Sequence, residues 1–543
     1  MDKNKIVQAI FYLSFLFYSL GFIDGATIAS CSQTPYPEIC NHFMNTNILE
    51  TEKDQTPFTF RDQSLLVTMN HAIKAHQMIL SLEMNDSFDE KAKLARADCV
   101  ELYEDTIDHL NRSLFVSSSN NNNPVDSQTW LSAANTNLQT CQNGFTEFNL
   151  TSNYLESLLL PDMLSNFSKL LSNSLAINKE NYYISPLYNS KTVHPGSSGG
   201  GGRKLLHDDE FPWWVSVTDR KLLQSSPEAD IVVAQDGSGN YKTIGEAVAA
   251  SATRRSGNKR FVIYVKKGVY KEYVEIKNSM NNLMLIGDGI DATIVTGNKN
   301  NQDGSTTFRS ATFAVSGEGF IAKDITFENT AGPQKHQAVA LRSGSDFSVF
   351  YSCSFKGYQD TLYVYSQRQF YRDCDIYGTV DFIFGNAVVV FQNCNIYVRK
   401  PMSGQKNTVT AQARTDPNEN TGIIIHNSRV TAASDLRPVQ GSFKSYLGRP
   451  WQEYSRTVIL KSNLDGLIDP AGWLPWSGNF ALSTLYYAEY MNSGSGASTG
   501  DRVKWPGYHV ITKVTDAGKF TVGNFLAGDS WIPATGVPFD SGL

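Results

Sequence analysis

Two aspartates lie 21 residues apart in similar short motifs. Asp360 occurs in GYQDTLY and Asp381 in GTVDFIFG. Two carboxylates held side by side cannot both ionise easily, so the pair divides into one acid with a raised pKa and one carboxylate. Such a pair offers one acid and one carboxylate to the same reaction. A solvated aspartate pair at two turns is the alternative for either motif taken alone.

The surroundings of the two aspartates favour the catalytic interpretation. Aromatic side chains flank both of them, and glycines nearby allow close backbone turns, which predicts an aromatic cleft. A separate motif, YLGRPWQEYSR, places Arg449 two residues before Trp451, and an arginine beside an aromatic ring can hold a carboxylate and pack on a sugar. The flanking residues are Tyr358, Phe382, Phe384, Gly357, Gly378 and Gly385.

A repeat in the surrounding sequence predicts how the aspartates are positioned. VFYSCSFKG, QFYRDCDIYG and VVFQNCNIYV align with Cys353, Cys374 and Cys394 in one phase, 21 and then 20 residues apart. This period is one coil of a parallel β-helix, so the two aspartates, each seven residues after a cysteine, stack about 5 Å apart on adjacent coils. A β-sandwich is the alternative, but Greek-key sheets would not keep this phase. Neighbouring cysteines would lie within disulfide range, and one of the three would stay free.

The first half of the chain predicts a four-helix bundle. Its stretches 62–83, 90–114 and 127–148 carry apolar residues three and four positions apart. Cys31 and Cys40 can staple a hairpin, and Cys99 and Cys141 lie on consecutive predicted helices that they can clamp. No histidines stand at metal-ligand spacing, so we expect no metal site. This half gathers no catalytic cluster, so we expect an interaction or folding role.

Length and charge agree with two units. The chain has 543 residues, which exceeds what one hydrophobic core usually serves. From Ser226 onward the sequence has 31 basic and 28 acidic residues, a net charge of +3, and the preceding part has 16 and 25, a net charge of −9. A mildly basic unit suits an acidic partner, but the surplus is too small for nucleic-acid binding.

Several features predict secretion and processing. Residues 1–26 have a short basic start and an apolar run, as a signal peptide does, although an uncleaved membrane anchor is the alternative. The segment 182–225 is rich in glycine and serine and carries Arg-Lys-Leu-Leu twice, which predicts a linker cut by proteases at Arg203, Lys204, Arg220 and Lys221. Four glycosylation motifs occur before Ser226, at Asn85, Asn111, Asn149 and Asn166.

The N-terminal half resembles the pectin methylesterase and invertase inhibitor family. ADCVELYEDTIDHL, WLSAANTNLQTC and the four-cysteine pattern carry this resemblance over residues 29–181. It implies a pro-domain that inhibits the second half or assists its folding. In the related precursors a dibasic-Leu-Leu motif at this boundary is cut by subtilisin-like proteases, although two arginines are commoner there than Arg-Lys.

The second half, residues 226–543, resembles the plant pectin methylesterases. AQDGSGNYKTIGEAV, GPQKHQAVALR, GYQDTLY, GTVDFIFGNA and YLGRPW look like that family's blocks, in order. The resemblance implies a secreted cell-wall enzyme with a right-handed parallel β-helix. The enzyme would hydrolyse the methyl esters of pectin to pectate and methanol without a cofactor, and a separate inhibitor protein is a further expected partner.

The resemblance also implies roles for individual residues. Asp381 would attack the ester carbonyl, and Asp360 would protonate methanol and then activate water. Gln337 and Gln359 would donate hydrogen bonds to the oxyanion. Arg449 would keep Asp381 ionised and oriented. The remaining assignments are sugar contacts by Thr307 and Trp451, substrate contacts by Gln337 and Arg449, and a Cys374–Cys394 disulfide.

Two alternatives stay open at this point. Another β-helical pectin enzyme, a polygalacturonase or a pectate lyase, would also use carboxylates, but a lyase needs a carboxylate cluster for calcium, and here two glutamines accompany the pair. A non-catalytic wall-binding or inhibitor protein is the second alternative. The complete set of two aspartates, two glutamines and an arginine argues against it.

Overall fold

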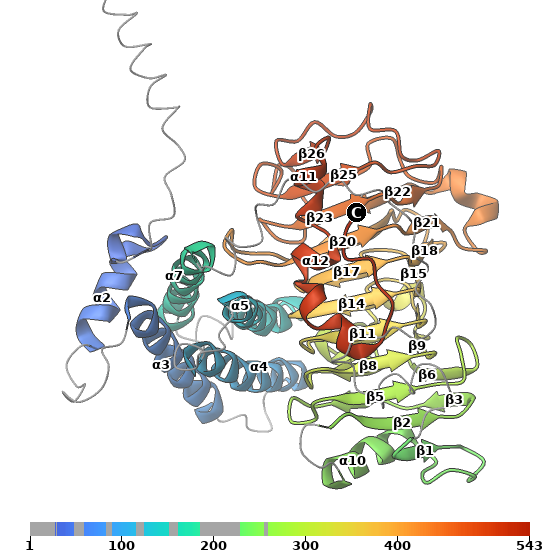
Figure 1. The fold of residues 1–543 in the computed structure, drawn as a ribbon, viewed down its shortest axis with the longest axis horizontal. Coiled ribbons are helices and arrows are strands. Elements are labelled where there is room, and N and C mark those ends of the chain that lie inside the picture. Colours follow the sequence, from blue (N-terminus) through green and yellow to red (C-terminus); the bar gives the residue numbers. More distant parts are fainter. Residues whose placement is uncertain are drawn as a thin grey trace, which may run out of the picture.

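A helical unit and a strand-rich unit make up the protein (Figure 1). The computed structural model describes residues 28, 30–47, 59–82, 89–115, 124–150, 161–184, 229–254 and 259–543. The predicted signal segment 1–26, Asn85 and the four basic processing residues lie outside these ranges. Among the described residues, no helix is both long and apolar enough to cross a bilayer.

The N-terminal unit is the predicted helical bundle. Helix α3 begins with a capping box, in which the Thr59 side chain accepts from the backbone of Asp62 and the Asp62 side chain accepts from that of Thr59. The bundle buries its apolar stripes around Leu102, Leu131 and Leu171. Its helices are α2 (Pro37–Asn47), α3 (Phe60–Ser81), α4 (Glu90–Phe115), α5 (Pro124–Glu147) and α7 (Pro161–Ile184), preceded by the short η1 (Cys31–Gln33).

Both predicted N-terminal disulfides are present. Cys31–Cys40 joins η1 to α2, and Cys99–Cys141 joins α4 to α5 with a Cα–Cα distance of 4.6 Å. The second bond holds α4 and α5 at a fixed relative position, which matters because these two helices contact the other unit.

The second unit is the predicted parallel β-helix, with three sheets along its length and only parallel pairing between its strands. It is right-handed, as parallel crossovers almost always are. The eleven-stranded sheet contains β1 (Ile231–Val233), β2 (Phe261–Val265), β5 (Leu283–Ile286), β8 (Ile321–Lys323), β11 (Ser348–Tyr351), β14 (Arg368–Arg372), β17 (Val388–Gln392), β20 (Gly422–His426), β23 (Arg456–Leu460), β25 (Tyr486–Tyr490) and β26 (Tyr508–Val510).

The other two sheets complete each coil. The eight-stranded sheet contains β3 (Gly268–Lys271), β6 (Thr293–Gly297), β9 (Thr326–Asn329), β12 (Ser354–Lys356), β15 (Asp375–Gly378), β18 (Asn395–Val398), β21 (Arg429–Ala432) and β24 (Asn463–Leu464). The seven-stranded sheet contains β4 (Val274–Ile276), β7 (Phe313–Val315), β10 (Leu341–Ser343), β13 (Leu362–Val364), β16 (Ile383–Gly385), β19 (Asn407–Gln412) and β22 (Ser445–Gly448).

Side chains stack in register inside the coils, as the repeat predicts. Ser354 pairs with Asp375 and Asp375 with Asn395, which keeps the 21- and 20-residue steps of the sequence. Aromatic rings follow the same register, and Phe350 stacks on Tyr371 with ring centroids 4.7 Å apart. Helix α10 (Ile244–Arg254) packs on the first coils, and the short α11 (Val514–Gly518) and α12 (Val522–Phe525) cover the eleven-stranded sheet from outside.

The predicted Cys374–Cys394 disulfide is wrong for this structure. Cys353, Cys374 and Cys394 are all free, buried thiols. The thiols of Cys374 and Cys394 each have a backbone acceptor. Cys374 Sγ lies 3.3 Å from the carbonyl oxygen of Phe350, and Cys394 Sγ lies 3.5 Å from the carbonyl oxygen of Gln392. Stacking on adjacent coils therefore brings the cysteines together without requiring a bond between them.

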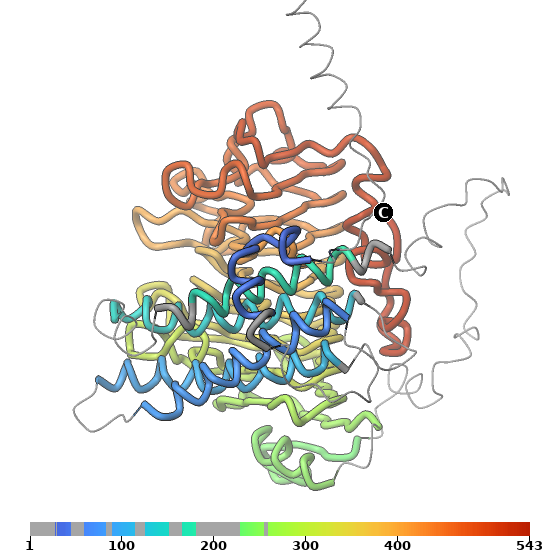
Figure 2. The backbone as a smooth tube through the Cα atoms, turned by 90° about the vertical axis from the view of Figure 1, so that its left-hand side faces the viewer, coloured from blue at the N-terminus to red at the C-terminus, as the bar shows by residue number. Residues whose placement is uncertain are grey.

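The helical unit lies against the outer face of the seven-stranded sheet (Figure 2). Helices α4 and α5 are the ones nearest to the β-helix, and α2 and α3 lie farther out (Figure 1). One apolar cluster contains residues of both units, among them Phe145 of α5 and Tyr363 and Phe384 of the sheet. The bundle thus buries one face of the β-helix.

Candidate active site

Asp360 and Asp381 occupy the same turn position on adjacent coils. Each precedes a strand of the seven-stranded sheet by two residues, and Leu362 of β13 pairs with Ile383 of β16. Parallel strands lie about 4.8 Å apart, so the two backbones run side by side. Both aspartates have a left-handed backbone, with φ of 61° and 50°. Such conformations in non-glycine residues often occur at functional sites.

Asp381 is held by two residues from later coils. Arg449, directly after β22, donates from Nε to Oδ1 at 2.8 Å and from Nη2 to Oδ2 at 2.6 Å. Thr408 of β19 donates its hydroxyl to Oδ1 at 2.6 Å. The same hydroxyl accepts the Asp381 backbone N–H at 2.8 Å. The carboxylate therefore has a fixed orientation and a direct cationic partner.

Asp360 has the character of an acid. Its side chain is only 7% exposed, and no hydrogen bond to it is made by the described side chains. Burial raises the pKa of the Asp360 carboxyl well above its usual range, and the negative charges of Asp381 and Glu147 add to this rise. The Arg449 cation opposes it. Asp381 is thus held in an ion pair, and the pKa of the neighbouring Asp360 carboxyl is raised.

The two predicted amide donors lie next to the pair. Gln359 directly precedes Asp360, and its carbonyl oxygen accepts the Ala338 N–H at 3.3 Å, which joins it to the coil of Gln337. The Gln337 carbonyl accepts from the Asn301 N–H at 2.9 Å. Neither side-chain amide donates to another described residue, and both are half-buried. Both amides therefore remain available to a ligand.

Aromatic rings form one side of the site. Tyr363 stacks on Phe384 with ring centroids 4.2 Å apart, and Trp451 lies 5.9 Å from Phe384. Trp476 lies 4.3 Å from the Arg449 guanidinium. Phe382, expected in the cleft, instead packs inside the β-helix, because it lies at the turn where the chain points into the core.

Sequence reasoning missed three of these residues. Thr408 and Trp476 lie in stretches without a recognisable motif, and they reach the site only because their coils stack above it. Tyr363 had a usable signal, because it lies one coil period, 21 residues, before Phe384.

Helix α5 covers this site. Glu147 at its C-terminal end accepts the Thr307 backbone N–H at 2.8 Å and the Asn301 side-chain amide at 3.4 Å. Burial raises the pKa of the Glu147 carboxyl to about 7. The Tyr365 hydroxyl of the sheet donates to Asn137 Oδ1 at 2.7 Å. A cavity of about 10 Å³ remains between α5 and the aromatic rings, which is room for about one water molecule.

Further contacts extend along the whole length of α5. Asn135 donates to Glu419 at 2.5 Å near the middle of the helix. Near its N-terminal end, Arg368 of the β-helix donates to Asp126 at 2.5 Å. The interface is therefore polar at both ends and apolar over the aromatic rings.

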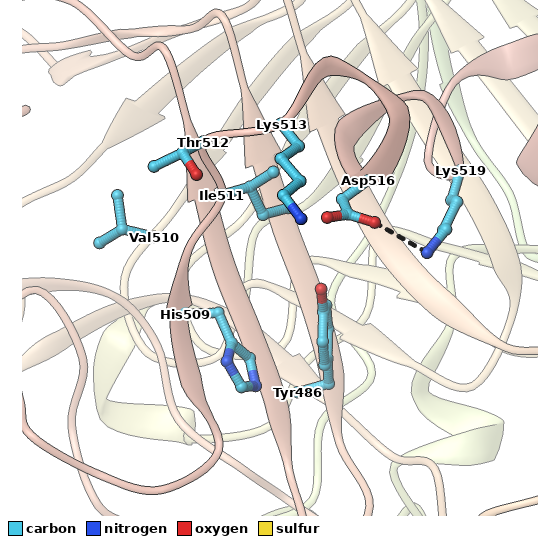
Figure 3. Close-up of a pocket in the computed structure, with 8 residues that line it drawn as sticks. All are labelled: Tyr486, His509, Val510, Ile511, Thr512, Lys513, Asp516 and Lys519. Atoms are coloured by element: carbon cyan, nitrogen blue, oxygen red, sulfur yellow. Dashed lines mark hydrogen bonds and ion pairs between the residues drawn. The ribbon is translucent and has the colours of Figure 1, made fainter. Parts of the chain in front are cut away.

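A second hollow lies at the C-terminal end of the β-helix (Figure 3). It has a volume of about 240 Å³ and is formed by β25, β26 and the loop before α11. Its one carboxylate, Asp516, is bound to Lys519 at 2.9 Å. It contains no carboxylate pair, so the chemistry of Asp360 and Asp381 has no counterpart there.

Comparisons with known proteins agree with this arrangement. Residues 230–529 match the pectinesterase family, and residues 26–177 match the plant invertase/pectin methylesterase inhibitor family. The chain is 56% identical to "Probable pectinesterase/pectinesterase inhibitor 6" of Arabidopsis thaliana over 99% of this chain and 98% of that protein. It is 54% identical to "Pectinesterase 2" of Citrus sinensis, over 97% and 96% of the two chains.

A solved structure, "Pectin methylesterase from Carrot", matches with 60% identity and a TM-score of 0.58. The match covers 59% of this chain and 99% of the carrot chain. The β-helix, the paired aspartates and the matches over both units lead to one conclusion: the chain belongs to the pectinesterase family of carboxylic ester hydrolases and carries, before its catalytic unit, a domain of the pectin methylesterase inhibitor family.

Proposed function

We propose that this protein removes methyl groups from pectin by hydrolysing its galacturonate methyl esters through a covalent aspartyl intermediate. The observation that carries the proposal is the Arg449–Asp381 ion pair beside the buried Asp360, whose pKa is raised by burial and by the neighbouring carboxylates. The catalytic unit in this proposal is residues 226–543.

In the first half of the reaction, Asp381 attacks the ester carbonyl carbon. The carbon becomes tetrahedral, and its oxygen takes up the negative charge, toward which the amides of Gln337 and Gln359 donate. The intermediate then collapses with cleavage of the bond to the methoxy oxygen, which receives the Asp360 proton and leaves as methanol. An anhydride joins Asp381 to the galacturonate, and Asp360 is now a carboxylate.

In the second half, Asp360 acts as a base. It takes a proton from water while the water oxygen attacks the galacturonate carbonyl. The anhydride bond breaks, Asp381 returns as a carboxylate, and the sugar keeps a free carboxyl group. Arg449 holds Asp381 in one orientation through both steps. The substrate contacts in this proposal come from Thr307, Gln337, Arg449 and Trp451.

In the same proposal the helical unit, residues 29–181, keeps the enzyme inactive before processing. Glu147 fills the space next to Thr307 and Asp360, and α5 covers the aromatic rings that a sugar would contact. A pectin chain and α5 cannot occupy this face together. The same contacts can also assist folding, because α4 and α5 bury an apolar face that would otherwise meet water.

Secretion and cleavage precede activity in this scheme. Residues 1–26 direct the chain to the cell wall, and a subtilisin-like protease cuts the 182–225 segment at Arg203–Lys204 or Arg220–Lys221. Asn111 and Asn149 are exposed and Asn166 is half-buried, so the first two side chains are accessible to glycosylation. Once the helical unit has left, a separate inhibitor protein of the same family can bind the vacated face.

Methanol release tests the proposal. A specific protease site placed in the 182–225 segment allows the full-length protein to be cut and the two units to be separated. We expect methanol from highly methylated pectin after the cut, with no shortening of the polymer. Chain shortening would instead indicate a polygalacturonase or a lyase, and methanol release at full rate before the cut would contradict the occlusion.

Asp381→Asn tests the nucleophile. Asparagine tolerates the left-handed backbone at this turn, so the protein should fold, but the rate should fall by about a thousandfold or more because the attacking carboxylate is lost. Asp373→Asn is the matched control, since Asp373 has φ of 53° at another turn, between β14 and β15. Normal activity of the Asp381 variant would contradict the mechanism.

A further inference from the structure

Two arginines lie on the face of the β-helix that the helical unit covers. Arg309 belongs to the short helix η5 (Phe308–Ser310), two residues after Thr307. Arg342 belongs to β10, where it pairs in register with Tyr363 of the next coil. Tyr363 in turn stacks on Phe384, so Arg342 continues the line of side chains that leads to the catalytic pair.

Arg309 pairs with two carboxylates of the helical unit. Its Nε forms an ion pair with Asp98 Oδ1, and its Nη2 lies 3.0 Å from Glu101 Oε2. Both acids belong to α4, and Asp98 also accepts from the Thr306 hydroxyl at 2.7 Å. Within the described residues, Arg309 has no ion pair to a carboxylate of the β-helix itself.

Arg342 is a buried cation without a direct ion pair in the described part of the chain. Its side chain is 5% exposed, and its Nε has no hydrogen-bond partner there. The guanidinium lies 3.5 Å from the Phe308 ring centroid. Burial raises the pKa of Asp98 and of Asp105, and the Arg342 charge opposes both rises, so carboxylates of α4 are among the counter-charges of Arg342.

We propose that Arg309 and Arg342 form a carboxylate-binding subsite for ionised galacturonate units of the pectin chain, a few sugars away from the reacting ester. This inference rests on the function proposed above. In the uncut protein the acids of α4 neutralise this subsite, and removal of the helical unit leaves two guanidinium groups on an aromatic surface without carboxylate partners. Uncompensated charges of this kind are costly, and arginine binds carboxylates with strong, directional hydrogen bonds.

The subsite has a consequence for substrate choice. A fully methylated chain offers it only neutral esters, whereas a partly de-esterified chain offers carboxylates. The cut enzyme should therefore bind partly methylated pectin more tightly than fully methylated pectin.

The test measures KM and kcat of the cut protein, freed of its helical unit, on half-methylated and on fully methylated pectin at low salt. Arg309→Gln, Arg342→Gln and the double variant are compared with Arg429→Gln, a control on the eight-stranded sheet whose side chain is 57% exposed. We expect the double variant to raise KM for half-methylated pectin at least about tenfold, because two charged hydrogen-bond donors to the carboxylate are lost, and to leave kcat unchanged. KM for fully methylated pectin should change less than about twofold.

Direct binding gives a second readout. Methyl-free oligogalacturonate cannot react, and calorimetry should show about tenfold weaker binding to the double variant, together with a smaller salt dependence than in the wild type. If Arg342→Gln fails to fold, Arg309→Gln alone carries the test, because Arg309 is partly exposed.

Three outcomes would overturn parts of the scheme separately. If the double variant changed KM equally for half-methylated and fully methylated pectin, the arginines would stabilise the substrate-binding face without recognising carboxylates. If the double variant had unchanged KM and unchanged oligogalacturonate binding, the subsite would be disproved, but the proposed esterase function would not be affected. If the cut wild-type protein released no methanol, the proposed esterase function itself would be contradicted.

Discussion

Thr408 is the residue whose part in the site is least visible in the sequence. Its hydroxyl joins the backbone N–H of Asp381 to the carboxylate of the same residue, so it fixes both the left-handed turn and the side chain. Its side chain is fully buried, and its hydroxyl acts through Asp381. We regard it as a positioning residue for the nucleophile.

Replacing Thr408 separates positioning from binding. Thr408→Val keeps the shape of the side chain but removes the hydroxyl, and we expect kcat for methanol release to fall about 10- to 100-fold with KM unchanged, because an oriented attack geometry is lost. Thr408→Ser keeps the hydroxyl and should retain most of the activity. Equal losses in both variants would indicate a packing role only.

At the scale of elements, the coil is the unit that brings chemistry together. Asp360 and Asp381 meet because β13 and β16 stack in register, and Arg449 arrives from β22, two strands farther along the same sheet. Insertion or deletion of one residue in any of these coils would rotate every following side chain away from its neighbour.

The cysteine stack gives a test at this scale. With all three cysteines of the β-helix free, the cut catalytic unit, denatured without a reductant, should take up three equivalents of an alkylating reagent, measured by intact mass. The helical unit, with two disulfides, should take up none before reduction and four after it. If the catalytic unit took up only one equivalent, two of its three cysteines would be joined, as the predicted Cys374–Cys394 bond requires.

At the scale of the whole molecule, the interface between the units concentrates buried carboxyls. Burial raises the pKa of Asp98 to about 6, outweighing its ion pair with Arg309, and burial raises that of Glu147 to about 7. Glu147 also faces Asp360, whose pKa it raises, and Asp98 faces Glu101 and Arg342. Separation of the units would return both carboxyls to ordinary values of about 4.

Docking of the two units should therefore depend on pH. Because the docked state binds these protons more tightly, docking is strongest below about pH 4 and weakens as pH rises through 6 and 7. We expect the dissociation constant between the cut units to rise at least about tenfold from pH 5 to pH 8, measured by calorimetry. Glu147→Gln should flatten this change, and Glu90→Gln, at an 81% exposed position on α4, should not. A pH-independent constant would contradict the assignment.

The sequence by itself determined the architecture of both units and the stacking of Asp360 and Asp381 on adjacent coils. Periodicity is a local property: apolar residues three and four apart specify the helices, and the 21- and 20-residue steps between cysteines specify the coil and place Asp360 and Asp381 on it. The two N-terminal disulfides followed from the spacing of their cysteines in the same way.

Only the tertiary structure decided the contacts between distant segments. Thr408 and Trp476 reach the site through the stacking of coils, and the thiols of Cys374 and Cys394 find backbone acceptors that no spacing reveals. The position of Glu147 against Thr307 joins residues 160 positions apart. Such contacts depend on how whole surfaces fit together, because burial and charge are properties of the assembled face, and no short motif encodes them.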